Sequence, residues 1–128
     1  MINVAAAVIV NNDRDILITQ RSEEDKLSLK WEFPGGKIEN GETAEECLER
    51  EIMEELNLKI EVLEYLGSCV HKYDTKEICL IAHKARVLSE NMKLNVHNAV
   101  RWVKAYELKN YDFAPADIKL LQVIGDKI

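Results

Sequence analysis

Residues 36–58, with the sequence GKIENGETAEECLEREIMEELNL, determine the fold that we expect for the whole chain. Thr43 stands directly before a segment without Gly or Pro, and Glu46 follows it three residues later, which is the spacing of a helix capping box. Asn57 tolerates the left-handed backbone conformation that often ends a helix. The sequence therefore predicts a helix over residues 44–56.

A helical projection of this segment separates its glutamates into two groups. The apolar residues that fall on one face are Ala44, Leu48, Ile52 and Leu56, with Cys47 at the edge. Glu51 and Glu55 project inside or beside this apolar face, and Glu54 lies next to them. Arg50 points roughly opposite to Leu48, so no Lys or Arg shares the face with the three carboxylates. Like charges on a buried side are costly unless cations neutralise them or some carboxyls keep their protons.

The acidic face has two interpretations. A divalent metal ion would neutralise it, because hard cations such as Mg²⁺ and Mn²⁺ prefer oxygen ligands. The alternative is a solvated acidic helix, which is what most Glu-rich helices are. The helical projection alone leaves both interpretations open.

The spacing of the charged residues resembles the Nudix box. Gly36 is followed after five residues by Glu42, after seven more by REIMEE at 50–55, and then by LNL at 56–58. The family usually has Gly where this chain has Asn57, at the helix end, where Asn is the next best residue. The resemblance implies a Nudix hydrolase with an α/β/α sandwich around a mixed sheet.

The same resemblance implies roles at the site. Glu51 would be the base, Arg50 would orient it, and the metal would be Mg²⁺ or Mn²⁺. The implied metal ligands are the side chains of Glu51, Glu54 and Glu55 and the backbone carbonyl of Gly36. The alternative for Arg50 is a simple i,i+4 ion pair with Glu46 or Glu54, worth a few tenths of a kcal/mol.

Three segments outside the box resemble the MutT- and NudG-like branch of the family, which cleaves nucleoside triphosphates. They are ITQR at 18–21, WEFPGGK at 31–37 and FAPAD at 113–117. The implied substrate-binding residues are Arg21 and Glu32 for the nucleotide, Lys37 for the phosphates, and Phe113 and Asp117 of the FAPAD segment. The alternatives are that Arg21 is a solvated loop charge and that Asp117 caps the last helix.

Asp117 bears on the choice of base, because an ionised carboxylate only accepts hydrogen bonds. It can accept them from the amino group of cytosine or from guanine N–H groups. This favours a cytosine-type or modified pyrimidine nucleotide slightly over 8-oxoguanine. A second departure from the family is Val96, which stands where MutT has a further acidic residue near the metals. His97 and Glu90 are the nearby candidates to replace it, although a lone loop His is more often solvated.

The composition is that of one ordinary globular domain, which we expect to span residues 1–128. Three cysteines without paired spacing predict reduced thiols in a cytoplasmic protein. The N-terminal apolar run has no basic residues before it and is too short for a membrane anchor. A net charge of −6 argues against stable nucleic-acid binding. The expected partner is a small nucleotide, bound by a monomer or homodimer.

The remaining segments predict strands around the acidic helix. A hairpin is expected from strands at 3–10 and 15–19, a short strand at 31–33 leads into a PGG turn, and residues 21–30 and 89–98 are loops. A second hairpin joins 58–71 to 77–88 through a turn at 73–76, a further strand covers 100–103, and Pro115 begins a final helix. We expect an α/β layered domain, with a strand order that periodicity does not reveal.

These expectations combine into one principal functional hypothesis. It is a metal-dependent pyrophosphatase that converts a nucleoside triphosphate into a monophosphate and pyrophosphate and so cleans the nucleotide pool. The alternatives are hydrolysis of ADP-ribose or a dinucleoside polyphosphate, and a Nudix-like module that binds a nucleotide without cleaving it. The complete set of box glutamates and Arg50 favours the enzyme over the binding module.

Overall fold

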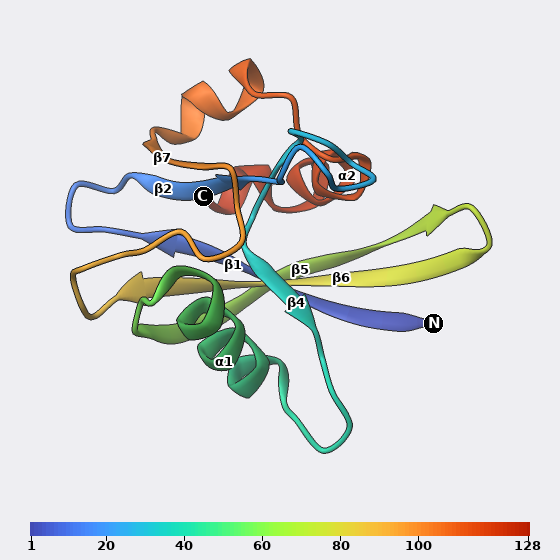
Figure 1. Ribbon diagram of the computed structural model, residues 1–128, viewed down its shortest axis with the longest axis horizontal. Coiled ribbons are helices and arrows are strands. Elements are labelled where there is room, and N and C mark those ends of the chain that lie inside the picture. Colours follow the sequence, from blue (N-terminus) through green and yellow to red (C-terminus); the bar gives the residue numbers. More distant parts are fainter.

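The computed structural model describes residues 1–128 and contains one mixed sheet with helices on both sides (Figure 1). The strands are β1 (Ile2–Val10), β2 (Ile16–Gln20), β3 (Trp31–Glu32), β4 (Gly35–Lys37), β5 (Ile60–Tyr73), β6 (Lys76–Val87) and β7 (Ala99–Val103). The α-helices are α1 (Ala44–Leu56) and α2 (Pro115–Ile124), and the 3₁₀ helices are η1 (Ala105–Asn110) and η2 (Gly125–Lys127). None of the helices is long and apolar enough to cross a lipid bilayer.

Strand β1 lies at the centre of the sheet. The strand order is β3-β2-β1-β6-β5, with β4 paired to β1 and β7 paired to β2. Strand β1 runs parallel to β6 and antiparallel to β2 and β4. The sheet is therefore mixed, as the sequence predicted.

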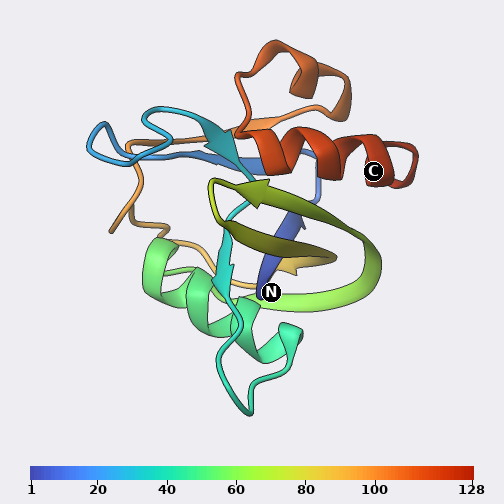
Figure 2. The same cartoon turned by 90° about the vertical axis from the view of Figure 1, so that its right-hand side faces the viewer.

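The apolar run of β1 is buried on both faces of the sheet, which explains why it does not alternate with polar residues. Ala6 and Val8 belong to the core beneath α2, together with Leu120 and Ile124 of that helix. The other face packs against α1 and contributes Ala5, Ala7 and Ile9. The two helices therefore cover opposite faces of the sheet, as Figure 2 shows from the side.

Helix α1 begins and ends where the sequence predicted. The Thr43 side chain accepts a hydrogen bond from the Glu46 backbone N–H at 3.0 Å, and the Glu46 carboxylate accepts one from the Thr43 N–H at 2.9 Å. Asn57 has a φ of 52°, in the left-handed region, and its N–H donates to the Met53 carbonyl. Asn therefore provides here the helix end that Gly usually provides.

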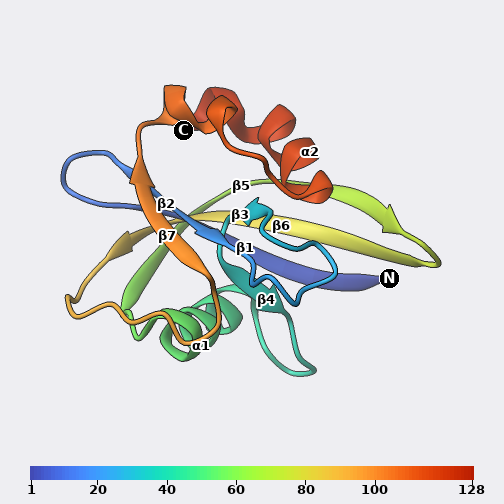
Figure 3. The same cartoon turned by 45° about the horizontal axis from the view of Figure 1, so that its top comes forward.

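The loop between β6 and β7 is held against the C-terminal end of α1 (Figure 3). Lys93 N donates to the Leu56 carbonyl and Asn95 N donates to the Glu55 carbonyl. The Asn95 side chain donates to the Glu54 carbonyl at 2.8 Å. The loop thus satisfies carbonyls that a helix end leaves without intrahelical partners, and it brings residues 96 and 97 to the acidic end of the helix.

One local prediction is wrong. The PGG segment is not simply a turn, because Gly35–Lys37 forms β4 and pairs with residues 4–6 of β1. The turn of the second hairpin is as predicted, since Tyr73 and Lys76 pair at its ends with Asp74 and Thr75 between them. The strand pairing at β4 depends on contacts with a distant segment, which local turn propensity cannot reveal.

Replacing Thr43 with Ala tests the cap of α1. The substitution removes the acceptor for the Glu46 N–H and should lower the free energy of unfolding by about 1 kcal/mol. Thr43→Ser keeps the hydroxyl and should retain most of the stability. Urea unfolding followed by far-UV circular dichroism measures both, and equal stability of Thr43→Ala and wild type would contradict a capping role.

Candidate active site

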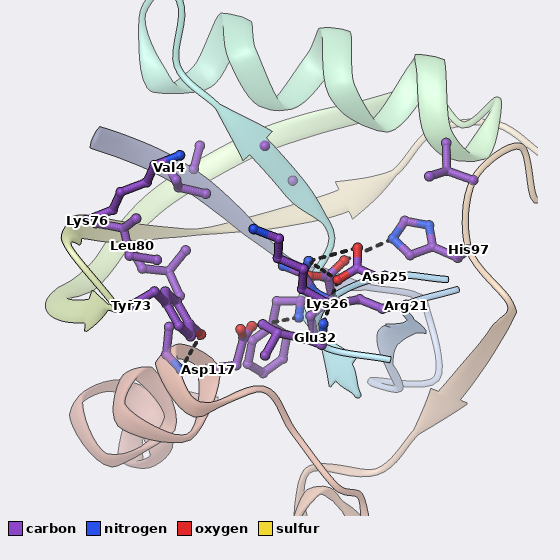
Figure 4. A pocket seen from close by; sticks show the side chains of 18 of the residues that line it. Val4, Arg21, Asp25, Lys26, Glu32, Tyr73, Lys76, Leu80, His97 and Asp117 are labelled. Carbon is purple, nitrogen blue, oxygen red and sulfur yellow. Dashed lines mark hydrogen bonds and ion pairs between the residues drawn. The ribbon is translucent and has the colours of Figure 1, made fainter. Parts of the chain in front are cut away.

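A cavity of about 950 Å³ lies between the C-terminal end of α1 and the first turn of α2 (Figure 4). Its walls come from β1, β3, β4, the β5–β6 hairpin, the first turn of α2 and the loop after β2. Glu55 and Gly36 line it on the side of α1, whereas Asp117 lines it on the side of α2. The cavity therefore connects the acidic helix to the FAPAD segment, two features that are far apart in the sequence.

The acidic cluster is built on close packing between α1 and β4. A Cβ atom added to Gly36 would lie 2.4 Å from Cδ of Glu51, so a larger residue would force this carboxylate out of its present position. Glu55 has an Oε1 atom that is buried without a hydrogen-bond partner. Glu54 lies at the rim, where its side chain is 60 % exposed. The sequence thus correctly placed Glu51 and Glu55 on the inner side of the helix.

The pKa of Glu55 records the cost of this arrangement. Burial, followed by repulsion from Glu51 and Glu32, raises the pKa of the Glu55 carboxyl to about 9. Glu55 therefore holds a proton at neutral pH unless a positive charge takes its place.

The helical projection suggested that Arg50 points away from the acidic cluster, but in the structure it points toward it. Its Nη1 lies 2.7 Å from Oε1 of Glu51, and its Nε lies 2.7 Å from Oε2 of Glu42. Hydrogen bonds from Arg50 lower the pKa of Glu42 to about 2. The long side chain turns back over the helix, so the expectation that no cation shares the face is wrong. A looser i,i+4 contact of 3.5 Å to Glu54 also exists.

A second charged cluster, centred on Glu32, also lines the cavity. Glu32 receives Arg21 Nη2 on Oε1 and His97 Nε2 on Oε2, both at 3.0 Å. Arg21 also pairs with Asp25 at 3.1 Å. Burial alone would lower the pKa of Arg21, but Glu32 and Asp25 raise it above its ordinary value. Arg21 is therefore not a solvated loop charge. His97 is not solvated either, because its side chain is only 4 % exposed.

Asp117 lies in the cavity wall and does not cap α2. The helix begins after Ala114 without a side-chain cap, and Asp117 Oδ2 instead accepts a hydrogen bond from the Phe33 N–H at 3.0 Å. Burial, followed by repulsion from Glu32, raises the pKa of Asp117 to about 7. The capping alternative is therefore wrong, and the carboxyl is available to a ligand.

A family model described as the NUDIX domain matches residues 1–124. The chain belongs to the Nudix family. It is 36 % identical over 122 residues to the CTP pyrophosphohydrolase of Escherichia coli (strain K12), and the alignment covers 95 % of this chain and 90 % of that protein. It is 32 % identical over 121 residues to the 8-oxo-dGTP diphosphatase of Haemophilus influenzae, covering 94 % of this chain and 89 % of that protein.

A solved structure agrees with this assignment. The solution structure of the MutT Nudix hydrolase from methicillin-resistant Staphylococcus aureus 252 has a TM-score of 0.76 and 38 % identity, covering 99 % of this chain and 97 % of that chain. The predicted Nudix fold and the assignment to the hydrolases of this family are thereby confirmed.

The oxygen atoms of the Nudix box fit a hard divalent cation. They comprise carboxylates and a backbone carbonyl, and one of them is a buried oxygen that lacks a partner. The acidic side chains are not gathered at metal-ligand distances in this structure. Glu51 is ion-paired with Arg50, and the Glu54 side chain points toward solvent. A cation at this position would compete with Arg50 and with the Glu55 proton.

Five residues of the Nudix prediction do not lie in the cavity wall, namely Arg50, Glu51, Glu54, Lys37 and Phe113. Phe113 is buried behind the wall, where its ring packs on Phe33 with centroids 5.5 Å apart. Lys37 is exposed at the end of β4 and makes no ion pair. Glu90 is also exposed and does not join the acidic cluster. Contact of Lys37 with phosphates stays a prediction.

Sequence reasoning missed several side chains that line the cavity, of which three carry a phenol or an ammonium group. These three are Lys26, Tyr73 and Lys76. Lys26 belongs to a polar loop and the other two belong to a segment predicted as a turn, so no periodic pattern pointed to them. Only the pairing of β5 with β6 and the packing of α2 on β5 and β6 bring Tyr73 and Lys76 to the site.

The raised pKa of Asp117 predicts how stability changes with pH. Between its ordinary value of 3.8 and the value of about 7, the folded protein keeps a proton that the unfolded chain releases. The contribution of Asp117 to the free energy of unfolding should therefore fall as pH rises through this window, by at most about 1.4 kcal/mol per pH unit. Asp117→Asn keeps an acceptor for Phe33 and should remove this contribution.

Urea unfolding at several pH values between 4 and 8 measures the effect. Other carboxylates titrate in the same range, so the relevant quantity is the difference between wild type and Asp117→Asn. A difference that stays constant across the window would show that Asp117 is not held protonated by burial.

Proposed function

We propose that this Nudix hydrolase cleaves a nucleoside triphosphate into a monophosphate and pyrophosphate with Mg²⁺ or Mn²⁺. The observation that carries the proposal is the single cavity that exposes Glu55 and Gly36 on one side and Asp117 on the other. One nucleotide can therefore contact the acidic cluster through its phosphates and Asp117 through its base. The names of the Escherichia coli and Haemophilus influenzae relatives favour cytosine or 8-oxoguanine nucleotides and a role in cleaning the nucleotide pool.

The proposed metal ligands are those of the Nudix box: the Gly36 carbonyl and the carboxylates of Glu51, Glu54 and Glu55. When bound there, a divalent cation neutralises phosphate oxygens and lowers the pKa of a coordinated water.

The side chains around this position have separate tasks. Glu51 accepts the proton of the attacking water, and Arg50, at 2.7 Å, holds the Glu51 carboxylate in a fixed orientation. Glu32 positions the nucleotide. Arg21 and His97 hold the Glu32 carboxylate in place by binding one of its oxygens each. Lys37, with a free ammonium group, approaches the outer phosphate.

At the other side of the cavity, Asp117 accepts a hydrogen bond from the base. Its Oδ2 is already bound to the Phe33 N–H, which fixes the carboxyl and leaves Oδ1 for the substrate. Phe113 acts indirectly, because it supports the Phe33 ring from behind. This arrangement favours the cytosine amino group, with 8-oxoguanine as the second candidate.

The working form that we propose is one catalytic domain over residues 1–128, active as a monomer or homodimer. The three cysteines are all unpaired, which suits the reducing cytoplasm.

A nucleotide panel tests the proposed reaction. The panel contains the ordinary ribo- and deoxyribonucleoside triphosphates, 8-oxo-dGTP, 5-modified dCTP and ADP-ribose, each incubated with Mg²⁺, with products separated by ion-exchange chromatography. Monophosphate and pyrophosphate from a triphosphate would support the proposal. Cleavage of ADP-ribose alone, or of nothing, would contradict it.

Replacing Glu51 with Gln should abolish most of the activity. The amide keeps the size of the side chain but cannot take up a proton, so kcat should fall by about 10²- to 10⁴-fold. Glu49→Gln is the matched control, because Glu49 is an exposed glutamate of the same helix. Steady-state kinetics of both variants decide the matter, and near-normal turnover of Glu51→Gln would refute its role as the base.

Metal binding should be visible without turnover. Mg²⁺ or Mn²⁺ at about 100 times Kd should stabilise the metal-stripped protein by about 2.7 kcal/mol, because only the folded state presents the ligands. Glu55→Gln removes one ligand charge and should reduce this stabilisation strongly, whereas Glu49→Gln should leave it intact. Thermal unfolding with and without the cation measures the shift, and an unchanged shift in Glu55→Gln would exclude Glu55 as a ligand.

A further inference from the structure

Tyr73, which the proposed reaction does not yet use, lies in the wall of the active-site cavity. It is the last residue of β5 and its ring is half-buried against the core beneath α2. Its phenolic oxygen accepts a hydrogen bond from the Ala116 N–H at 3.1 Å. This N–H belongs to the first turn of α2, where backbone donors have no intrahelical acceptor. The contact fixes the position of the phenolic oxygen.

The phenolic proton of Tyr73 has no acceptor within the protein. The contact with Ala116 uses the oxygen as an acceptor, and the phenol donates no hydrogen bond in return. Burial raises the pKa of Tyr73, so the group keeps its proton at neutral pH. Tyr73 is therefore a fixed donor with an unused hydrogen.

Asp117 lies beside this donor. It follows Ala116 directly in the first turn of α2, and both Asp117 and Tyr73 line the cavity. Figure 4 shows the Tyr73 ring next to the turn from which Asp117 projects. Asp117 Oδ2 is bound to Phe33, which leaves the other oxygen as an acceptor. One end of the cavity thus presents a hydrogen-bond donor and an acceptor side by side.

We propose that Tyr73 is a specificity-determining residue, whose O–H donates to the ring nitrogen N3 of a cytosine base while Asp117 accepts from the adjacent amino group. The inference rests on the proposed function and deepens it by assigning the base. Cytosine presents an amino donor next to a ring acceptor on this edge, whereas uracil presents a carbonyl acceptor next to an N–H donor. Uracil would therefore place its N–H against the Tyr73 O–H and its carbonyl against the Asp117 carboxylate when that carboxylate is ionised.

This mismatch gives the pair its power of discrimination. A buried donor or acceptor that is left unpaired costs more than a single hydrogen bond contributes. Adenine carries the same donor–acceptor pair as cytosine on a larger ring system, so ATP belongs in the test.

The experiment is a cycle of one protein change and one substrate change. Wild type and Tyr73→Phe are compared on CTP and on 3-deaza-CTP, in which a C–H replaces N3, and also on UTP and ATP. Tyr73→Phe should lower kcat/KM for CTP by about 3- to 12-fold, the range of one neutral hydrogen bond. It should leave kcat/KM for 3-deaza-CTP unchanged and narrow the preference for CTP over UTP. Tyr106→Phe is the control, because Tyr106 is exposed and does not line the cavity.

Equal losses of Tyr73→Phe on CTP and on 3-deaza-CTP would overturn the proposal, since the phenol would then only support α2. A wild-type preference for ATP or UTP over CTP would overturn it as well. If Tyr73→Phe does not fold, wild type alone decides, because 3-deaza-CTP should be cleaved about 3- to 12-fold less efficiently than CTP. Failure of the proposed function is a different result, namely that wild type cleaves no nucleoside triphosphate.

Discussion

The contact between Gly36 and the Glu51 carboxylate is the constraint on which the rest of the site depends. A methyl group at residue 36 would overlap the carboxylate, and one at residue 35 would lie 1.9 Å from the Ala5 carbonyl oxygen. Two consecutive glycines therefore let β4 approach both β1 and α1. This approach places a backbone carbonyl, the inner glutamates of α1 and the buried centre of the sheet at one point. The cavity begins there.

The carboxylates of the site differ in how their negative charge is compensated. Arg50 covers Glu42 and Glu51, whereas Arg21 and His97 share Glu32. Glu55 and Asp117 have no such partner.

Burial keeps Glu55 protonated and leaves Asp117 only partly ionised at neutral pH. They lie on opposite sides of the same cavity, and each has a free oxygen for a ligand. A cation at Glu55 and a base donor at Asp117 would replace the protons that the metal-free protein must keep. The places where the fold leaves charge uncompensated are thus the places where the proposed substrate complex supplies compensation.

How far the sequence predicted this molecule depends on whether the signal was local. The helix at 44–56, its cap and the inner position of Glu51 and Glu55 follow from spacing within one segment, and the structure confirms them. The predicted direction of the Arg50 side chain was wrong, because a helical projection places only the Cβ atom and ignores the length of the arginine side chain.

The strand at β4, the burial of His97 and the presence of Tyr73 in the cavity could not be predicted for another reason. Each depends on a partner from a distant segment: β1 for β4, Glu32 for His97, and Ala116 for Tyr73. The resemblance to the Nudix family supplied the likeness of the FAPAD segment to nucleotide-binding proteins, but only the structure shows that Asp117 bonds to Phe33 and faces the cavity.

The most direct test of the central claim is a crystal structure with Mn²⁺ and the α,β-methylene analogue of CTP, which resists cleavage. We expect the phosphates and the metal to lie against Gly36, Glu51 and Glu55, with the base of the same molecule bound to Asp117. An analogue whose base lies outside the cavity, or whose phosphates lie away from the acidic helix, would contradict the claim that one nucleotide spans both ends of the site.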